Sequence, residues 1–180
     1  MKNNRLIIIL LIVFVALATL LAMQTSQPSG STVTTSDCSY CVFKDLRIDD
    51  IQAIRLRSPE TGQTFTIARA DDGSWTAPDS SGTLDVNGAE LIARTMVVLP
   101  FHRTVPLSAS EDKTTYGFTP EGILAVDIVL SSGSHAVAIG YRTPTGDAYY
   151  ALVDDRPDLY LLERSAVDFL IAALKTPPVA

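Results

Sequence analysis

The sequence has little cysteine, little histidine and no excess of basic residues, and each shortage argues against a class of protein. Two cysteines in 180 residues are too few for a small domain stapled by disulfides. With 14 basic and 20 acidic residues, the formal charge is −6, which argues against a nucleic-acid-binding protein. The apolar fraction of 47% is too high for a wholly disordered chain. The composition therefore favours a globular protein of about one domain.

The sequence also lacks the short motifs of several common active sites. It has no Gly-x-Ser-x-Gly turn, no Gly-x-x-x-x-Gly-Lys loop and no Gly-x-Gly-x-x-Gly fingerprint. His102 follows a predicted helix and His135 begins a predicted strand, so both are expected to face solvent. The acidic residues near Asp71 and Asp154 lack the alternating spacing of a calcium loop. We therefore predict no enzymatic activity, no cofactor and no metal site, with a hydrolase as the least favoured alternative.

The longest apolar run lies near the start of the sequence, from Leu6 to Met23. It has no charged residue, and as a helix its 18 residues would reach about 27 Å, close to the ~30 Å hydrocarbon core of a bilayer. Lys2 and Arg5 precede the run, and the next basic residue is Lys44. The positive-inside rule predicts a cytoplasmic N-terminus and a later domain outside the cytoplasm. Representative residues of the predicted anchor are Leu6, Ile9, Val13, Leu17 and Leu21.

A cleaved signal peptide is an alternative interpretation of the same run. Ala16-Leu17-Ala18 has the small-x-small form of a cleavage site. However, the chain stays apolar from Thr19 to Met23, which favours an uncleaved anchor. A lipoprotein is less favoured, because Asp37 directly precedes Cys38. All three interpretations export the rest of the chain.

A Ser/Thr-rich segment, residues 24–41, follows the apolar run and ends in Cys38-Ser-Tyr-Cys41. Its first part cannot bury enough apolar surface to offset its ordering entropy, so we interpret it as a tether. Covalent haem attachment is excluded, because Val42 rather than histidine follows the second cysteine. A redox pair and a structural zinc site remain alternatives. The favoured interpretation is a short-range disulfide between Cys38 and Cys41, formed outside the cytoplasm.

Alternating apolar residues and turn residues predict an antiparallel sheet within residues 42–176. The segments Ile54–Ile67 and Val126–Ile139 match each other as strand, glycine-containing turn and strand. The sequence around these two segments predicts strands at 54–57, 64–67, near 75, 124–130, 137–139, 148–153 and 159–162.

Two amphipathic helices are predicted. The first spans Val86–Leu99, with Asn87 as its cap and Pro100 after its end. The second begins at a Ser165 cap and ends before Pro177. The fold class is therefore α+β: a transmembrane helix followed by a domain of two strand–strand–helix units. The predicted divisions are a cytoplasmic N-terminus (1–5), the membrane helix (6–23), a linker (24–41), the domain (42–176) and a tail (177–180).

Several short motifs resemble a family of bacterial envelope proteins. The motifs are Asp71–Trp75, Tyr116–Pro120, Ile139–Gly140, Tyr149–Tyr150 and Leu159–Leu162, and the resemblance covers about residues 48–174. The family consists of membrane-anchored domains of unknown function, often encoded beside gliding-motility-type ABC transporters. The resemblance implies an ABC-transporter-associated role and assigns no catalytic residue.

The adjacent residues Tyr149 and Tyr150 lie in a predicted strand, where neighbouring side chains point to opposite faces. One of them is therefore a candidate for a partner-binding surface. We predict a single-pass, non-catalytic accessory or scaffold subunit of a larger membrane protein complex. Its expected partners are the bilayer, through residues 6–23, and integral membrane subunits of an ABC transporter or of a respiratory or photosynthetic complex. The alternative is a redox or metal-binding protein that uses Cys38 and Cys41.

Overall fold

The computed structural model describes residues 38–108, 110–119 and 121–180. Two short 3-10 helices are η1 (Ile48–Asp50) and η2 (Lys113–Tyr116). The α-helices are α2 (Val86–Val97) and α3 (Arg164–Lys175). The strands are β1 (Ile51–Arg57), β2 (Thr64–Arg69), β3 (Trp75–Thr76), β4 (Phe101–Pro106), β5 (Leu124–Leu130), β6 (Gly133–Arg142), β7 (Ala148–Val153) and β8 (Asp158–Glu163).

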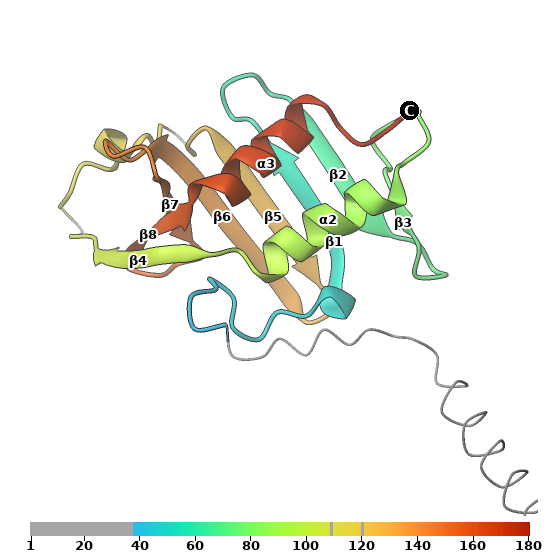
Figure 1. Cartoon of the computed structure of the whole chain (residues 1–180), viewed down its shortest axis with the longest axis horizontal. Coiled ribbons are helices and arrows are strands. Elements are labelled where there is room, and N and C mark those ends of the chain that lie inside the picture. The colour runs from blue at the N-terminus through green and yellow to red at the C-terminus, as the bar shows by residue number, and fades with distance from the viewer. Residues whose placement is uncertain (1–37, 109, 120) are drawn as a thin grey trace, which may run out of the picture. The chain divides into compact units, whose positions relative to one another are not determined.

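All eight strands belong to one antiparallel sheet, in the order β3-β2-β1-β5-β6-β7-β8-β4. Both α-helices lie on the same face of this sheet (Figure 1). The predicted α+β class with an antiparallel sheet and two helices is thus confirmed for the described part of the chain. Three strands precede α2 in sequence, and β5 to β8 precede α3.

The two matching segments of the sequence form two hairpins, β1–β2 and β5–β6. Ile54 lies opposite Ile67 in the first hairpin, and Val126 lies opposite Val137 in the second. All four side chains are at most 1% exposed, so the alternating apolar residues face the helices. Burying a side chain of this size stabilises the fold by about 1.5–3 kcal/mol. Because a slip of one residue would turn these side chains to the other face, their burial fixes the register of the hairpins.

Both helices form where the sequence predicts them, but their caps differ from the prediction. The side chain of Asp85, rather than that of Asn87, accepts a hydrogen bond from the Asn87 amide at 3.0 Å. An N-cap must stand outside the helix with extended backbone angles, and Asp85 does so. Ser165 does not cap α3 either. Its hydroxyl donates to the Glu163 carboxylate at 2.6 Å, and Glu163, the N-cap residue, makes no side-chain capping bond.

The strand β4 is not predicted from the sequence. Four of its six residues are exposed, so it lacks the alternation that marks a half-buried strand. It pairs with β8, more than fifty residues later, and forms one edge of the sheet. Its formation therefore depends on long-range pairing rather than on a local pattern.

Two helices are too narrow to cover eight strands. Strands lie about 4.8 Å apart, so the sheet is roughly 34 Å wide, whereas two packed helices cover about 20 Å. The segment that precedes β1 fills part of the difference. Its residues Val42, Phe43 and Leu46 are 3–5% exposed and belong to the same apolar core as the helices. The folded domain thus includes the residues that directly follow Cys41.

Candidate interaction surface

A β-bulge in β6 presents a tyrosine on the sheet face opposite the helices. Ile139 pairs with Ala151 and Arg142 pairs with Tyr149, so Gly140 and Tyr141 together lie opposite Tyr150. A bulge of this kind bends the strand and redirects a side chain. Tyr141 is 53% exposed as a result.

Residues 113–118, which belong to the long connection between β4 and β5, lie over this same sheet face. The η2 turn packs the ring of Tyr116 edge-to-face against Tyr150, with ring centroids 4.9 Å apart. The backbone passes so close to β6 that a Cβ on Gly140 would lie 2.1 Å from the Tyr116 carbonyl oxygen. A Cβ on Gly117 would likewise lie 2.5 Å from the Tyr141 ring. Glycine at these two positions therefore permits the close approach.

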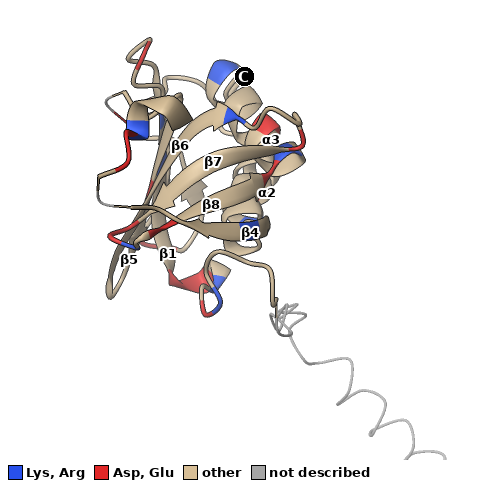
Figure 2. Cartoon of the chain, turned by 90° about the vertical axis from the view of Figure 1, so that its left-hand side faces the viewer, with Lys and Arg blue, Asp and Glu red and all other residues tan. Residues whose placement is uncertain are grey.

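Tyr116, Tyr141 and Tyr150 form what we call the tyrosine cluster. The hydrogen bond that Tyr116 donates to Glu111 raises the pKa of the Tyr116 phenol, so this ring stays neutral near pH 7. Lys, Arg, Asp and Glu lie mainly in turns and helices, whereas the β6–β8 ribbons carry few of them (Figure 2). Tyrosine is enriched at protein interfaces because its rigid ring contributes both apolar area and a hydroxyl. The cluster therefore has the composition of a binding surface.

Tyr149 and Tyr150 point to opposite faces of the sheet. Tyr149 is 5% exposed and faces α3, where its hydroxyl donates to Asp168 at 2.7 Å. It also accepts a hydrogen bond from Arg142 at 2.8 Å. Burial, followed by the bond to Asp168, raises the pKa of the Tyr149 phenol. Of the two predicted partner-surface candidates, only Tyr150 therefore lies on a face that a partner could contact.

The pKa of Asp168 is lowered, chiefly by the hydrogen bond from Tyr149. A carboxylate with a lowered pKa stabilises the fold above its unfolded-state pKa of about 3.9, and this stabilisation disappears as pH falls through the folded-state value. We expect Asp168→Asn to lower the denaturant midpoint at neutral pH. We also expect it to reduce the loss of stability below about pH 4. Denaturant unfolding of both proteins across this range is the measurement, and equal pH dependence would contradict the assignment.

The two histidines lie in different surroundings. His102 lies exposed on β4, as predicted. His135 is only partly solvent-facing: its side chain is 31% exposed, but the residue pairs with the buried Ile128 and shares its face of the sheet. Its ring stacks on Phe43 at 4.6 Å, and its Nδ1 lies 3.0 Å from an Asp154 carboxylate oxygen. No local pattern in the sequence indicates these two contacts, because His135 lies on β6, Asp154 lies in the turn after β7 and Phe43 comes from the start of the domain.

Cys38 and Cys41 form the predicted disulfide. Cys41 belongs to a β-bridge with Pro100, and the Phe101 amide donates to the Tyr40 carbonyl at 2.9 Å. The disulfide is therefore attached to the beginning of β4. Because a zinc site requires thiolates, this oxidised form does not favour the metal-binding alternative.

The acidic residues near Asp71 and Asp154 take part in hydrogen bonds within the protein. Asp72 accepts hydrogen bonds from the amide and the hydroxyl of Ser74, which lowers its pKa. Asp154 accepts a hydrogen bond from the Ala136 amide at 2.9 Å, and Arg156 lies 3.8 Å away. Within residues 38–108, 110–119 and 121–180, no three His, Cys, Asp or Glu side chains are grouped to hold a metal ion.

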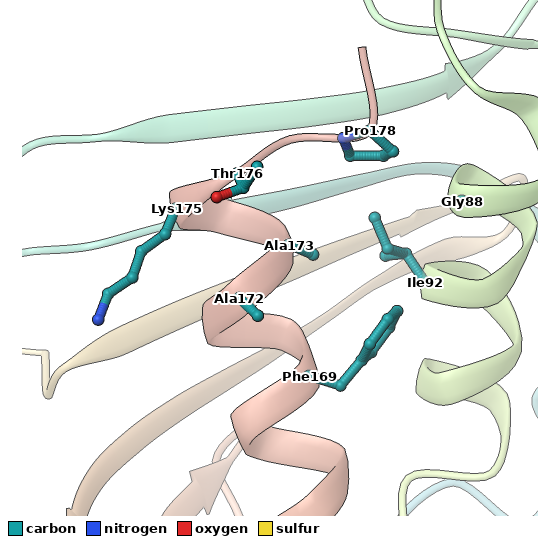
Figure 3. A pocket seen from close by; sticks show the side chains of 8 residues that line it. All are labelled: Gly88, Ile92, Phe169, Ala172, Ala173, Lys175, Thr176 and Pro178. Atoms are coloured by element: carbon teal, nitrogen blue, oxygen red, sulfur yellow. The ribbon is translucent and has the colours of Figure 1, made fainter.

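An apolar groove of about 400 Å³ lies between α2 and α3. Ile92 from α2 and Phe169 from α3 point into it from opposite sides (Figure 3). Its polar lining residues are Lys175 and Thr176, and the Lys175 side chain extends away from α2. The groove thus lacks the convergent polar groups that orient a specific small ligand.

The fold and these sites define a two-layer α+β domain with an aromatic surface on its helix-free face. In the described part of the chain, no helix is long and apolar enough to span a bilayer. The predicted anchor residues Leu6, Ile9, Val13, Leu17 and Leu21 lie outside the described residues. Comparison with family models, with curated proteins and with solved structures found no match.

Proposed function

We propose that the protein is a single-pass, membrane-anchored accessory or scaffold subunit of a larger membrane protein complex, without catalytic activity of its own. The observation that carries this proposal is the uncharged apolar run of residues 6–23, preceded by Lys2 and Arg5. It supports a cytoplasmic N-terminus and a domain outside the cytoplasm. A tethered domain meets neighbouring membrane proteins at a high effective concentration, so weak contacts suffice for binding.

In this proposal the tyrosine cluster supplies the main contact with an integral membrane partner. Tyr141 is 53% exposed and Tyr150 is partly exposed, and both are supported by residues 113–118. The resemblance of the sequence to transporter-associated envelope proteins favours an ABC transporter as the complex. A respiratory or photosynthetic electron-transfer complex fits the same residues equally well.

Extraction of the full chain from its native membranes in a gentle detergent tests this proposal. We expect the wild-type protein to emerge with stoichiometric integral membrane partners, identified by mass spectrometry. Tyr141→Ala removes an exposed ring, and a central interface tyrosine is worth about 2 kcal/mol, or roughly thirtyfold in affinity. We therefore expect this variant to lose most of the partner while it keeps its membrane level.

Tyr40→Ala is the matched control, because Tyr40 is 65% exposed and lies beside β4, away from the tyrosine cluster. It should retain the partner. A wild-type protein that runs as a free monomer would contradict the proposed function. Equal partner loss in both variants would contradict only the assignment of the surface.

A further inference from the structure

The two cysteines of the Cys38–Cys41 disulfide differ in exposure. Cys41 is 2% exposed, whereas Cys38 is partly exposed. Ser39 and Tyr40, the two residues between them, are both exposed. A thiolate from another protein can therefore approach Cys38 and is kept from Cys41.

The fold holds the Cys41 side of the bond independently of the disulfide. The Val42 amide donates to the Leu99 carbonyl, and the Phe101 amide donates to the Tyr40 carbonyl, both at 2.9 Å. The Val42 side chain that follows is buried in the core. The cysteines are only three positions apart, and so short a loop removes little entropy from the unfolded chain. Opening the disulfide should therefore leave the domain folded.

The reduced form also has a place for the buried sulfur. The Cys41 sulfur lies 3.4 Å from the Val98 carbonyl oxygen. After reduction, the Cys41 thiol can donate a hydrogen bond to this oxygen, which favours the protonated form of Cys41. The partly exposed Cys38 then remains as the cysteine that exchanges.

We propose that Cys38–Cys41 is a reversible thiol–disulfide exchange site that accepts two electrons from a dithiol protein outside the cytoplasm. One thiolate of the dithiol attacks the Cys38 sulfur, the Cys38–Cys41 bond breaks, and Cys41 leaves with the electron pair and takes up a proton. The second thiolate of the dithiol then attacks the dithiol's first sulfur, which is bonded to Cys38 in the mixed disulfide, and releases Cys38 as a thiolate. The dithiol is oxidised to a disulfide, and both cysteines are reduced. This activity goes beyond the proposed scaffold role, and only its location outside the cytoplasm rests on that proposal.

Equilibration of the full chain, in gentle detergent, with glutathione buffers of varied redox ratio tests the exchange. Samples are quenched with acid, and free thiols are labelled with a mass tag. We expect the pair to interconvert between disulfide and dithiol in native buffer, with an unchanged far-UV circular dichroism spectrum. Structural disulfides of exported proteins resist the glutathione pool. A pair that opens only in denaturant, or a fold that melts on reduction, would overturn the proposal.

Two single variants test the direction of attack. Cys41→Ser leaves the thiol of the partly exposed Cys38, and Cys38→Ser leaves the thiol of the buried Cys41. Because access controls the rate, we expect a chromogenic aromatic disulfide to react about tenfold or more faster with the Cys41→Ser variant. Equal rates, or faster reaction of the Cys38→Ser variant, would overturn the assignment of Cys38 as the entry point.

Discussion

Replacing Gly140 by alanine is expected to lower the free energy of unfolding by about 2–3 kcal/mol and to displace the β4–β5 connection. The added Cβ would lie 2.1 Å from the Tyr116 carbonyl oxygen and 3.1 Å from its carbonyl carbon. These are backbone atoms, so no side-chain rotation can relieve the overlap. Either the bulge of β6 or the η2 turn must move, and Tyr116 then loses its edge-to-face contact with Tyr150.

Denaturant unfolding of the full chain in gentle detergent measures the first effect, and hydrogen exchange of the η2 amides measures the second. Gly62→Ala is the matched control. Gly62 has a φ of 71°, but no atom lies within 4 Å of an added Cβ. Replacing Gly62 should lower the free energy of unfolding only by the penalty for a left-handed backbone, about 1 kcal/mol. It should leave hydrogen exchange of the η2 amides unchanged. Equal costs at the two glycines would contradict the close approach at Gly140.

The Gly140 variant also links the fold to the proposed function. If the tyrosine cluster binds a partner, displacing Tyr116 should weaken co-extraction even though the exposed ring of Tyr141 remains. Loss of the partner in both Gly140→Ala and Tyr141→Ala would identify the supported cluster, rather than a single ring, as the binding surface.

The sequence predicts the parts of this fold that depend on local patterns. Ile54 and Val126 lie in hairpins whose alternation fixes which residues face the core, and the two-residue turn before Gly133 closes the second hairpin. The helices follow from their apolar spacing. Asp85 was missed as a cap because Asn87, two positions later, is also a capping residue type, and only the backbone angles distinguish them.

The parts that escaped prediction depend on contacts between distant residues. The bulge at Tyr141 exists only relative to β7, and the edge-to-face contact of Tyr116 with Tyr150 requires a connection that passes over the sheet. The position of Tyr149 and Tyr150 as neighbours in a predicted strand did predict that they point to opposite faces. It could not predict which face the helices cover, and that choice decides which tyrosine is available to a partner.

Replacing Arg156 by methionine is expected to loosen the start of the domain, at a cost of about 2 kcal/mol. Its guanidinium donates to the Val42 carbonyl and to the Tyr160 hydroxyl, both at 2.9 Å. It also lies over the rings of Phe43 and Tyr160, 5.7 and 5.6 Å from their centroids. Without Arg156, two acceptors on buried residues lose their partner, and leaving such a group unsatisfied costs about 1–3 kcal/mol. The Arg156 side chain is 34% exposed, so water can replace part of this loss.

The Arg156→Met substitution should also loosen the segment that Arg156 contacts, in addition to lowering the overall stability. We expect the amides of residues 42–46 to exchange hydrogen much faster in Arg156→Met, because Arg156 joins this segment to the β7–β8 turn. Arg69→Met is the matched control: Arg69 also covers an aromatic ring, that of Trp75 at 4.0 Å, but it donates to the exposed Gly73 carbonyl. Its loss should cost under about 1 kcal/mol and leave residues 42–46 protected. If both variants behave alike, Arg156 contributes only its ring contacts, and the start of the domain is held by its apolar side chains.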